Sequence, residues 1–150
     1  MLLALIIWIG GILFFSAVQA PETAHVLGTS NPAFAEIIGR SLSILHYFGI
    51  ACGVLFLLAS AAEQSLINVR VAASSRVLVL LMLLVTAFSQ FYISRRLHEL
   101  RTAHSGFEQL AADDPARIAF NRLHRYSVDA EGAVLLLGFG AVVLTARRMA

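Results

Sequence analysis

The sequence predicts an all-α integral membrane protein, a four-helix bundle whose helices cross the bilayer up-down-up-down, with two long helices protruding on one face. Of the 150 residues, 59% are hydrophobic and only 13% are charged, whereas about a quarter of the residues of a globular domain are charged. The mean hydropathy is +0.80. Four apolar stretches approach the roughly 20 residues that a helix needs to cross the hydrocarbon core. They are Leu2–Ala20, Leu42–Ala62, Val77–Ile93 and Gly132–Ala146. Without a repeat or a linker, residues 1–150 are expected to form a single four-span transmembrane domain.

The first stretch is expected to be a retained helix rather than a cleaved signal peptide. It lacks a basic segment after Met1, and its apolar run is longer than that of a typical signal peptide. Pro21 directly follows Gln19 and Ala20, which makes a poor cleavage site.

The second and fourth stretches are each preceded by a helix start signal. Asn31-Pro32 and Asp114-Pro115 combine a preferred N-cap residue with proline at the first helical position. We therefore expect helices that begin at Pro32 and Pro115 and run about 30 residues, or roughly 45 Å, into the membrane. The third stretch is apolar all round, because Thr86 is its only polar residue between Val77 and Phe88.

Small residues in three stretches predict close helix packing. Gly49 and Gly53 form a GxxxG pair, a pattern that lets helix backbones approach each other. The contacts could lie within the bundle, with a second copy or with a partner helix. The predicted helix-packing residues are Gly10, Gly11, Gly49, Gly53, Gly138 and Gly140.

All five histidines are expected on one face of the membrane if the four stretches span it. Glu131 directly precedes the fourth stretch, where a carboxylate normally faces the bundle and a partner. On a helix it shares a stripe with Ser127 and His124. We expect it to contact Arg95, Arg96 or His46. The candidate polar site is His46, Arg95, Arg96, His124, Ser127 and Glu131. Polar residues also lie on the stripes of the second and third helices that could face it, Ser43 on the second and either Gln90 or Ser89 on the third.

Two other interpretations of these residues stay open. Arginines at span ends commonly snorkel to lipid headgroups, and Trp8, Tyr92 and Tyr126 fit an aromatic belt at the interface. Alternatively, His46 and His124 could ligate a b-type haem, as histidines of facing helices do in membrane cytochromes. No metal site is predicted, because the histidine spacing matches no closed zinc pattern and there is one cysteine.

The basic residues bear on location and orientation. All eleven are arginine, which together with the many alanines and leucines indicates a bacterial genome and the cytoplasmic (inner) membrane. Seven arginines lie on the histidine-bearing face and four on the other, so the positive-inside rule places the histidine-bearing face in the cytoplasm. Eight of the nine acids share that face, which weakens the asymmetry if they pair with its arginines. The net charge of +2, without a basic stripe, excludes a nucleic-acid partner.

Three stretches resemble the domain-of-unknown-function 4149 family, also called transmembrane protein 205-like. They are Trp8-Ile-Gly10-Gly11 with Phe14-Phe15 and Pro21, then Ile38-Gly39 with Leu42 and His46-Tyr47-Phe48, and Phe120 with Leu123-His124, Ser127 and Gly132. This chain has Ser94-Arg95 where the family often has Pro-Arg, and Glu131 where the family usually has Asn. The resemblance implies a four-span membrane fold and no reaction.

The sequence favours a non-enzymatic function, because it has no phosphate loop, nucleophile elbow or HExxH motif. The first hypothesis is an accessory or assembly subunit packed against a larger membrane complex. The alternatives are a small transporter or permeation factor with a polar site near Glu131, and a haem-binding electron carrier. The expected partners are the lipid bilayer, other membrane subunits or a second copy of the chain.

Overall fold

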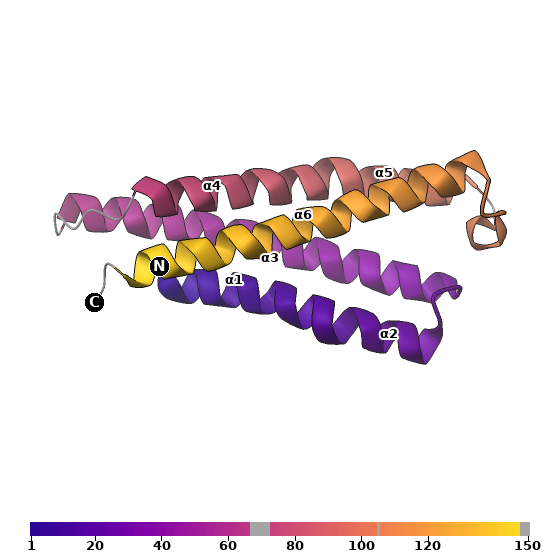
Figure 1. Ribbon diagram of the computed structural model, residues 1–150, viewed down its shortest axis with the longest axis horizontal. Coiled ribbons are helices and arrows are strands. Elements are labelled where there is room, and N and C mark those ends of the chain that lie inside the picture. Colours follow the sequence, from indigo (N-terminus) through magenta and orange to yellow (C-terminus); the bar gives the residue numbers. More distant parts are fainter. Residues whose placement is uncertain (67–72, 105, 148–150) are drawn as a thin grey trace.

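The computed structural model describes residues 1–66, 73–104 and 106–147, and these form four long helical stretches (Figure 1). The first consists of α1 (Leu2–Phe14), the π-helical segment η1 (Phe15–Gln19) and α2 (Ala20–Leu27). The second is α3 (Pro32–Leu66). The third consists of α4 (Ala73–Phe88), the π-helical segment η2 (Ser89–Ser94) and α5 (Arg95–Thr102). A short 3₁₀ turn, η3 (Phe107–Gln109), precedes the fourth, α6 (Pro115–Ala146).

The predicted start signals of the second and fourth helices are confirmed. Asn31 Oδ1 accepts a hydrogen bond from the Ala33 backbone N–H at 3.0 Å, and Asp114 Oδ1 accepts one from Ala116 at 2.8 Å. Each cap satisfies one of the backbone donors that a helix leaves free in its first turn. The helix from Pro115 is continuous to Ala146, as the sequence predicted.

The first and third helices extend further than their apolar stretches. The first stretch was expected to end at Ala20, but the helix continues past Pro21 to Leu27 and ends where Gly28 adopts a φ of 76°. The π-helical segment η1 ends directly before this continuation. A π turn, like a proline, interrupts the regular i to i−4 hydrogen bonds, so the proline is tolerated at this junction. The third helix continues through η2 to Thr102.

All four helices are long and apolar enough to cross a membrane: Leu2–Leu27, Pro32–Glu63, Ala73–Thr102 and Pro115–Ala146. Their outward faces are also apolar, with Leu3, Leu84 and Leu136 each about two-thirds or more exposed. A bundle that is apolar both inside and outside suits a lipid surrounding rather than water.

The close helix neighbours are α1 with α3, α3 with α4, α4 with α6, and α6 with α1, which leaves α3 and α6 on one diagonal of the bundle. In Figure 1 the start of α1 and the end of α6 lie at one end of the bundle, and the turn at 28–31 and the start of α6 lie at the other. Toward this loop end the bundle separates into two helix pairs, α2 with α3 and α5 with α6 (Figure 1).

The half of the bundle nearer the start of α1 and the end of α6 has a mainly apolar core, in which Ser60, Ser75 and Thr145 are also buried. Its centre is Trp8, only 1% exposed, which packs against Gly49 and Gly53 of α3. Trp8 therefore does not belong to an interfacial aromatic belt, because the two glycines open a space for its indole inside the bundle. The core cluster is Leu5, Trp8, Ile12, Cys52, Phe56, Val79, Met82, Val134 and Ala141.

The glycines singled out in the sequence divide into two groups. A Cβ on Gly11, Gly49, Gly53 or Gly138 would collide with a side chain of a neighbouring helix, and one on Gly140 would meet Leu78 at 3.2 Å. Gly10 has nothing within 4 Å of the position that a Cβ would take, and it faces outward.

Candidate functional site

A buried ionisable pair joins the two diagonal helices at the centre of the bundle. His46 of α3 is 1% exposed, and its Nε2 lies 2.5 Å from Oε1 of Glu131 on α6. The Glu131 side chain is 13% exposed. Of the three partners expected for Glu131, His46 is the one that it contacts.

The third helix completes the surroundings of the histidine. Gln90 of η2 places its Oε1 2.9 Å from His46 Nδ1, and its Nε2 donates to Ser43 Oγ of α3 at 3.4 Å. We call Ser43, His46, Gln90 and Glu131 the polar cluster. Because Gln90 lies within the π-helical segment, the cluster sits where the third helix departs from α-helical geometry, a departure often found at functional sites.

The hydrogen bonds constrain where protons lie in the polar cluster. An amide oxygen only accepts, so Nδ1 of His46 carries a proton that it donates to Gln90. Nε2 and Glu131 then share one further proton, held on the imidazole in an ion pair or on the carboxyl group in a neutral pair. The pair has no net charge in either arrangement. Gaining or losing one proton would give it a charge of plus or minus one, so it has the chemistry of a proton-exchange site.

Two buried serines lie next to the polar cluster in the sequence. Ser127 is 4% exposed and precedes Glu131 by about one helical turn. Ser89, fully buried beside Gln90, has a hydroxyl group without a hydrogen-bond partner among residues 1–66, 73–104 and 106–147. Polar character therefore extends beyond the four residues of the cluster on both α6 and η2.

A second glutamine makes a similar contact on the other side of α3. Gln19, the last residue of η1, donates from Nε2 to Ser41 Oγ at 2.5 Å. Neither Gln19 nor Ser41 was predicted from the sequence to belong to a polar contact. The available signal was that Gln19 and Gln90 each stand near the end of an otherwise apolar stretch.

The structure leaves both predicted arginines outside the polar cluster. Arg95 Nε and Arg96 Nη1 are exposed and bind the two carboxylate oxygens of Glu99, each at 2.9 Å. This carboxylate lies three and four residues further along the same helix, the spacing at which helical side chains meet. The local pairing satisfies both guanidinium groups, so neither turns inward to Glu131.

His124 also lies outside the polar cluster, although it shares a helix face with Glu131. It is exposed and stacks on Phe120, with the ring centroids 6.4 Å apart. Seven residues, or roughly 10 Å of helix, separate it from Glu131, and it lies toward the end where the two helix pairs diverge. The stripe of His124, Ser127 and Glu131 is therefore buried only at its last two members.

The remaining histidines are not gathered into a ligand set. His25, His98 and His104 are exposed, whereas His46 is buried with both ring nitrogens hydrogen-bonded. Within the described ranges no three His, Cys, Asp or Glu side chains stand together as metal ligands. Haem ligation by His46 and His124 would require the hydrogen bonds of His46 to break and the His124 side chain to turn inward. The Soret absorbance of the purified protein tests this possibility.

Four apolar helices around a buried polar cluster define this chain as a multi-pass membrane protein. It belongs to the family described as "Domain of unknown function (DUF4149)", whose model matches residues 3–105. No curated protein and no solved structure matches the chain. Ser43, His46 and Gln90 lie within the matched residues, whereas Glu131 and the motif from Phe120 to Ser127 lie beyond them.

Proposed function

We propose that this protein is a small proton-coupled permeation factor, and that the polar cluster is its proton-binding site. One observation carries the proposal: an ionisable pair, His46 with Glu131, lies inside a bundle of membrane-spanning length. Ionisable side chains at such depth are expensive, and in membrane proteins they commonly mark ion or proton pathways.

The composition of the polar cluster supports proton transfer rather than simple helix adhesion. A serine or an asparagine would supply an interhelical hydrogen bond without a titratable group. Here the contact across the diagonal is made by an imidazole and a carboxyl group, each of which can bind and release a proton. Gln90 fixes the imidazole ring through Nδ1, which leaves Nε2 to face the carboxyl group.

The position of the polar cluster suggests exchange with the membrane face at the loop end. The helix pairs diverge toward that end (Figure 1). The opposite half is closed by the apolar core around Trp8 and Phe56, both at most 1% exposed. Release on that side requires the core to rearrange, so the proposed mechanism is alternating access rather than an open pore.

Reconstituted vesicles test the proposal. The purified chain is placed in liposomes that contain a pH-sensitive dye, and a potassium diffusion potential drives proton uptake. We expect uptake above that of empty vesicles, and a loss of about 100-fold or more in Glu131→Gln and His46→Gln, the size typical of losing a positioned proton-transfer group. Glu36→Gln is the matched control, because Glu36 pairs with Arg40 on the exposed surface of α3.

Two results would overturn the proposal. One is uptake equal to that of empty vesicles with the folded wild-type protein. The other is uptake that the cluster variants and Glu36→Gln reduce to the same extent.

An accessory role is the second candidate, favoured by the glycines that face outward. Gly10, Gly39 and Gly132 each have open space where a Cβ would lie, so a partner helix could approach closely there. Purification in mild detergent tests this role. A stoichiometric membrane partner that Gly10→Leu releases, with the polar cluster intact, would favour the accessory subunit.

A further inference from the structure

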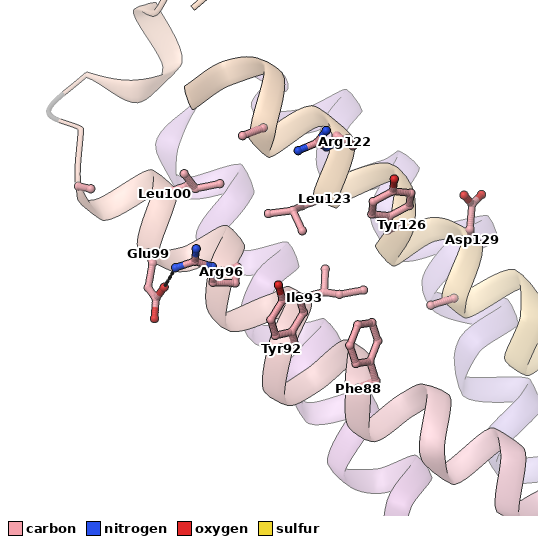
Figure 2. A pocket seen from close by; sticks show the side chains of 13 residues that line it. Phe88, Tyr92, Ile93, Arg96, Glu99, Leu100, Arg122, Leu123, Tyr126 and Asp129 are labelled. Carbon is pink, nitrogen blue, oxygen red and sulfur yellow. Dashed lines mark hydrogen bonds and ion pairs between the residues drawn. The ribbon is translucent and has the colours of Figure 1, made fainter. Parts of the chain in front are cut away.

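A second concave site lies on the outside of the bundle, between the third helix and α6. It is a groove of about 990 Å³ bounded by η2 and α5 on one wall and by α6 on the other (Figure 2). We call it the α5–α6 groove. Glu131 and His46 do not line it, so it is separate from the polar cluster.

The walls of the α5–α6 groove are apolar and aromatic. Ile93 and Leu123 meet from the two helices, and Ile93 is 2% exposed. Tyr92 and Tyr126 stand on facing walls, and Phe88 stacks on Tyr92 with the ring centroids 5.1 Å apart (Figure 2). Tyrosines with an apolar body and a polar tip are typical of the membrane–water interface.

Positive charge gathers toward the loop end of the groove. Arg96 comes from one wall and Arg122 from the other. Glu99 is already shared by Arg95 and Arg96, so that group keeps an excess positive charge. Arg122 makes no ion pair with any residue that the structure describes. Asp129, the other acid on the lining, points away from the facing wall in Figure 2.

The order of these features along the groove matches one kind of ligand. Phe88 ends α4 within the apolar stretch, whereas Arg96 lies in the polar extension α5. A ligand that fits has an acyl chain against the aromatic end and an anionic group at the arginine end. Guanidinium groups bind phosphate oxygens in paired hydrogen bonds, and basic pockets between membrane helices hold anionic lipid headgroups. We infer that the α5–α6 groove binds an anionic phospholipid, with its phosphate between Arg96 and Arg122.

Native mass spectrometry in mild detergent tests the inference with two probes, phosphatidylglycerol and phosphatidylcholine. We expect the protein to retain phosphatidylglycerol in preference. Each basic side chain near an anionic lipid contributes about 1 kcal/mol, so Arg96→Gln and Arg122→Gln should each raise the dissociation constant about 5-fold, and the double variant about 30-fold. Arg125→Gln is the matched control, because Arg125 is an exposed arginine of α6 that does not line the groove.

A second variant separates binding in the groove from general attraction to the surface. Ala119 lines the groove at a partly buried position, so the indole of Ala119→Trp would occupy the groove while every charged residue stays in place. We expect it to weaken phosphatidylglycerol binding as strongly as the double arginine variant, while 10 mM inorganic phosphate does not compete.

Three outcomes would overturn the inference. The first is an equal loss in Arg125→Gln and Arg122→Gln, which would mean nonspecific attraction. The second is unchanged binding in a folded Ala119→Trp protein. The third is a dimer that Ala119→Trp dissociates, which would assign the groove to a second copy of the chain. None of these results depends on proton uptake, so the inference and the proposed function fail separately.

Discussion

The two π-helical segments, η1 and η2, make the same kind of contact with α3 but differ in the side chains beside that contact. Each brings a glutamine to a serine of α3, Gln19 to Ser41 and Gln90 to Ser43. The Gln19 contact stops at the serine and is flanked by Phe14, Phe15 and Leu45, whereas the Gln90 amide also holds His46. The difference suggests that a glutamine–serine bond is a means of helix packing in this fold, and that function enters only where an ionisable pair is attached to it.

The largest expected effect comes from breaking the pair itself. Replacing Glu131 or His46 by leucine leaves the other ionisable side chain buried without its partner. Each single variant should therefore lower the free energy of unfolding by about 3 kcal/mol. The double variant should lose less free energy of unfolding than the sum of the two single variants, because it leaves no unpaired ionisable side chain. Reversible unfolding in mixed detergent micelles measures all three values. Additive losses would show that the two side chains are not energetically coupled.

The next largest effect is a loss of stability in the apolar core around Trp8, in the helix that continues into η1. Gly49→Ala would drive a methyl group into the Trp8 indole, and overpacking of this kind typically costs about 1–3 kcal/mol. Gly10→Ala adds the same atom where no neighbour lies within 4 Å, so its cost should be near zero. The two thermal unfolding curves in detergent give the comparison. Equal shifts in both variants would mean that Trp8 does not depend on the space at Gly49.

The glutamines provide the direct test of the comparison. Gln19→Leu removes one interhelical hydrogen bond and should cost about 0.6 kcal/mol, the average for such bonds in membrane proteins. Gln90→Leu also leaves His46 Nδ1 without its acceptor, so the loss should rise to about 1.5 kcal/mol. Only Gln90→Leu should slow proton uptake in vesicles. If Gln19→Leu slows uptake equally, the two segments do not differ in function.

The smallest effect is expected at His124. Its ring is exposed and stacks on Phe120 outside the polar cluster. His124→Ala should change stability by less than about 0.5 kcal/mol, as surface substitutions usually do. Proton uptake should be unchanged. A loss comparable to that of His46→Gln would show that His124 turns inward during the transport cycle.

Much of the fold followed from apolar length and from two start signals. The caps at Asn31 and Asp114 were predictable because Asn and Asp are preferred N-cap residues and proline is favoured at the first helical position. The continuation past Pro21 was not predictable, because it depends on a π turn, for which hydropathy gives no signal. Glu131 could be identified because a carboxylate beside an apolar run needs a partner. Which partner it takes depends on competition, and Glu99 had already engaged both arginines within their own helix turn.

Cys52, the only cysteine, belongs to the apolar core and is 6% exposed. Because it sits among Trp8 and its neighbours, a thiol-reactive dye can reach it only when that half of the bundle loosens. The native chain therefore carries its own reporter, and no label needs to be engineered. The rate at which a bulky maleimide modifies the thiol, with and without an imposed proton gradient, would measure whether the closed half opens as the proposed transport requires.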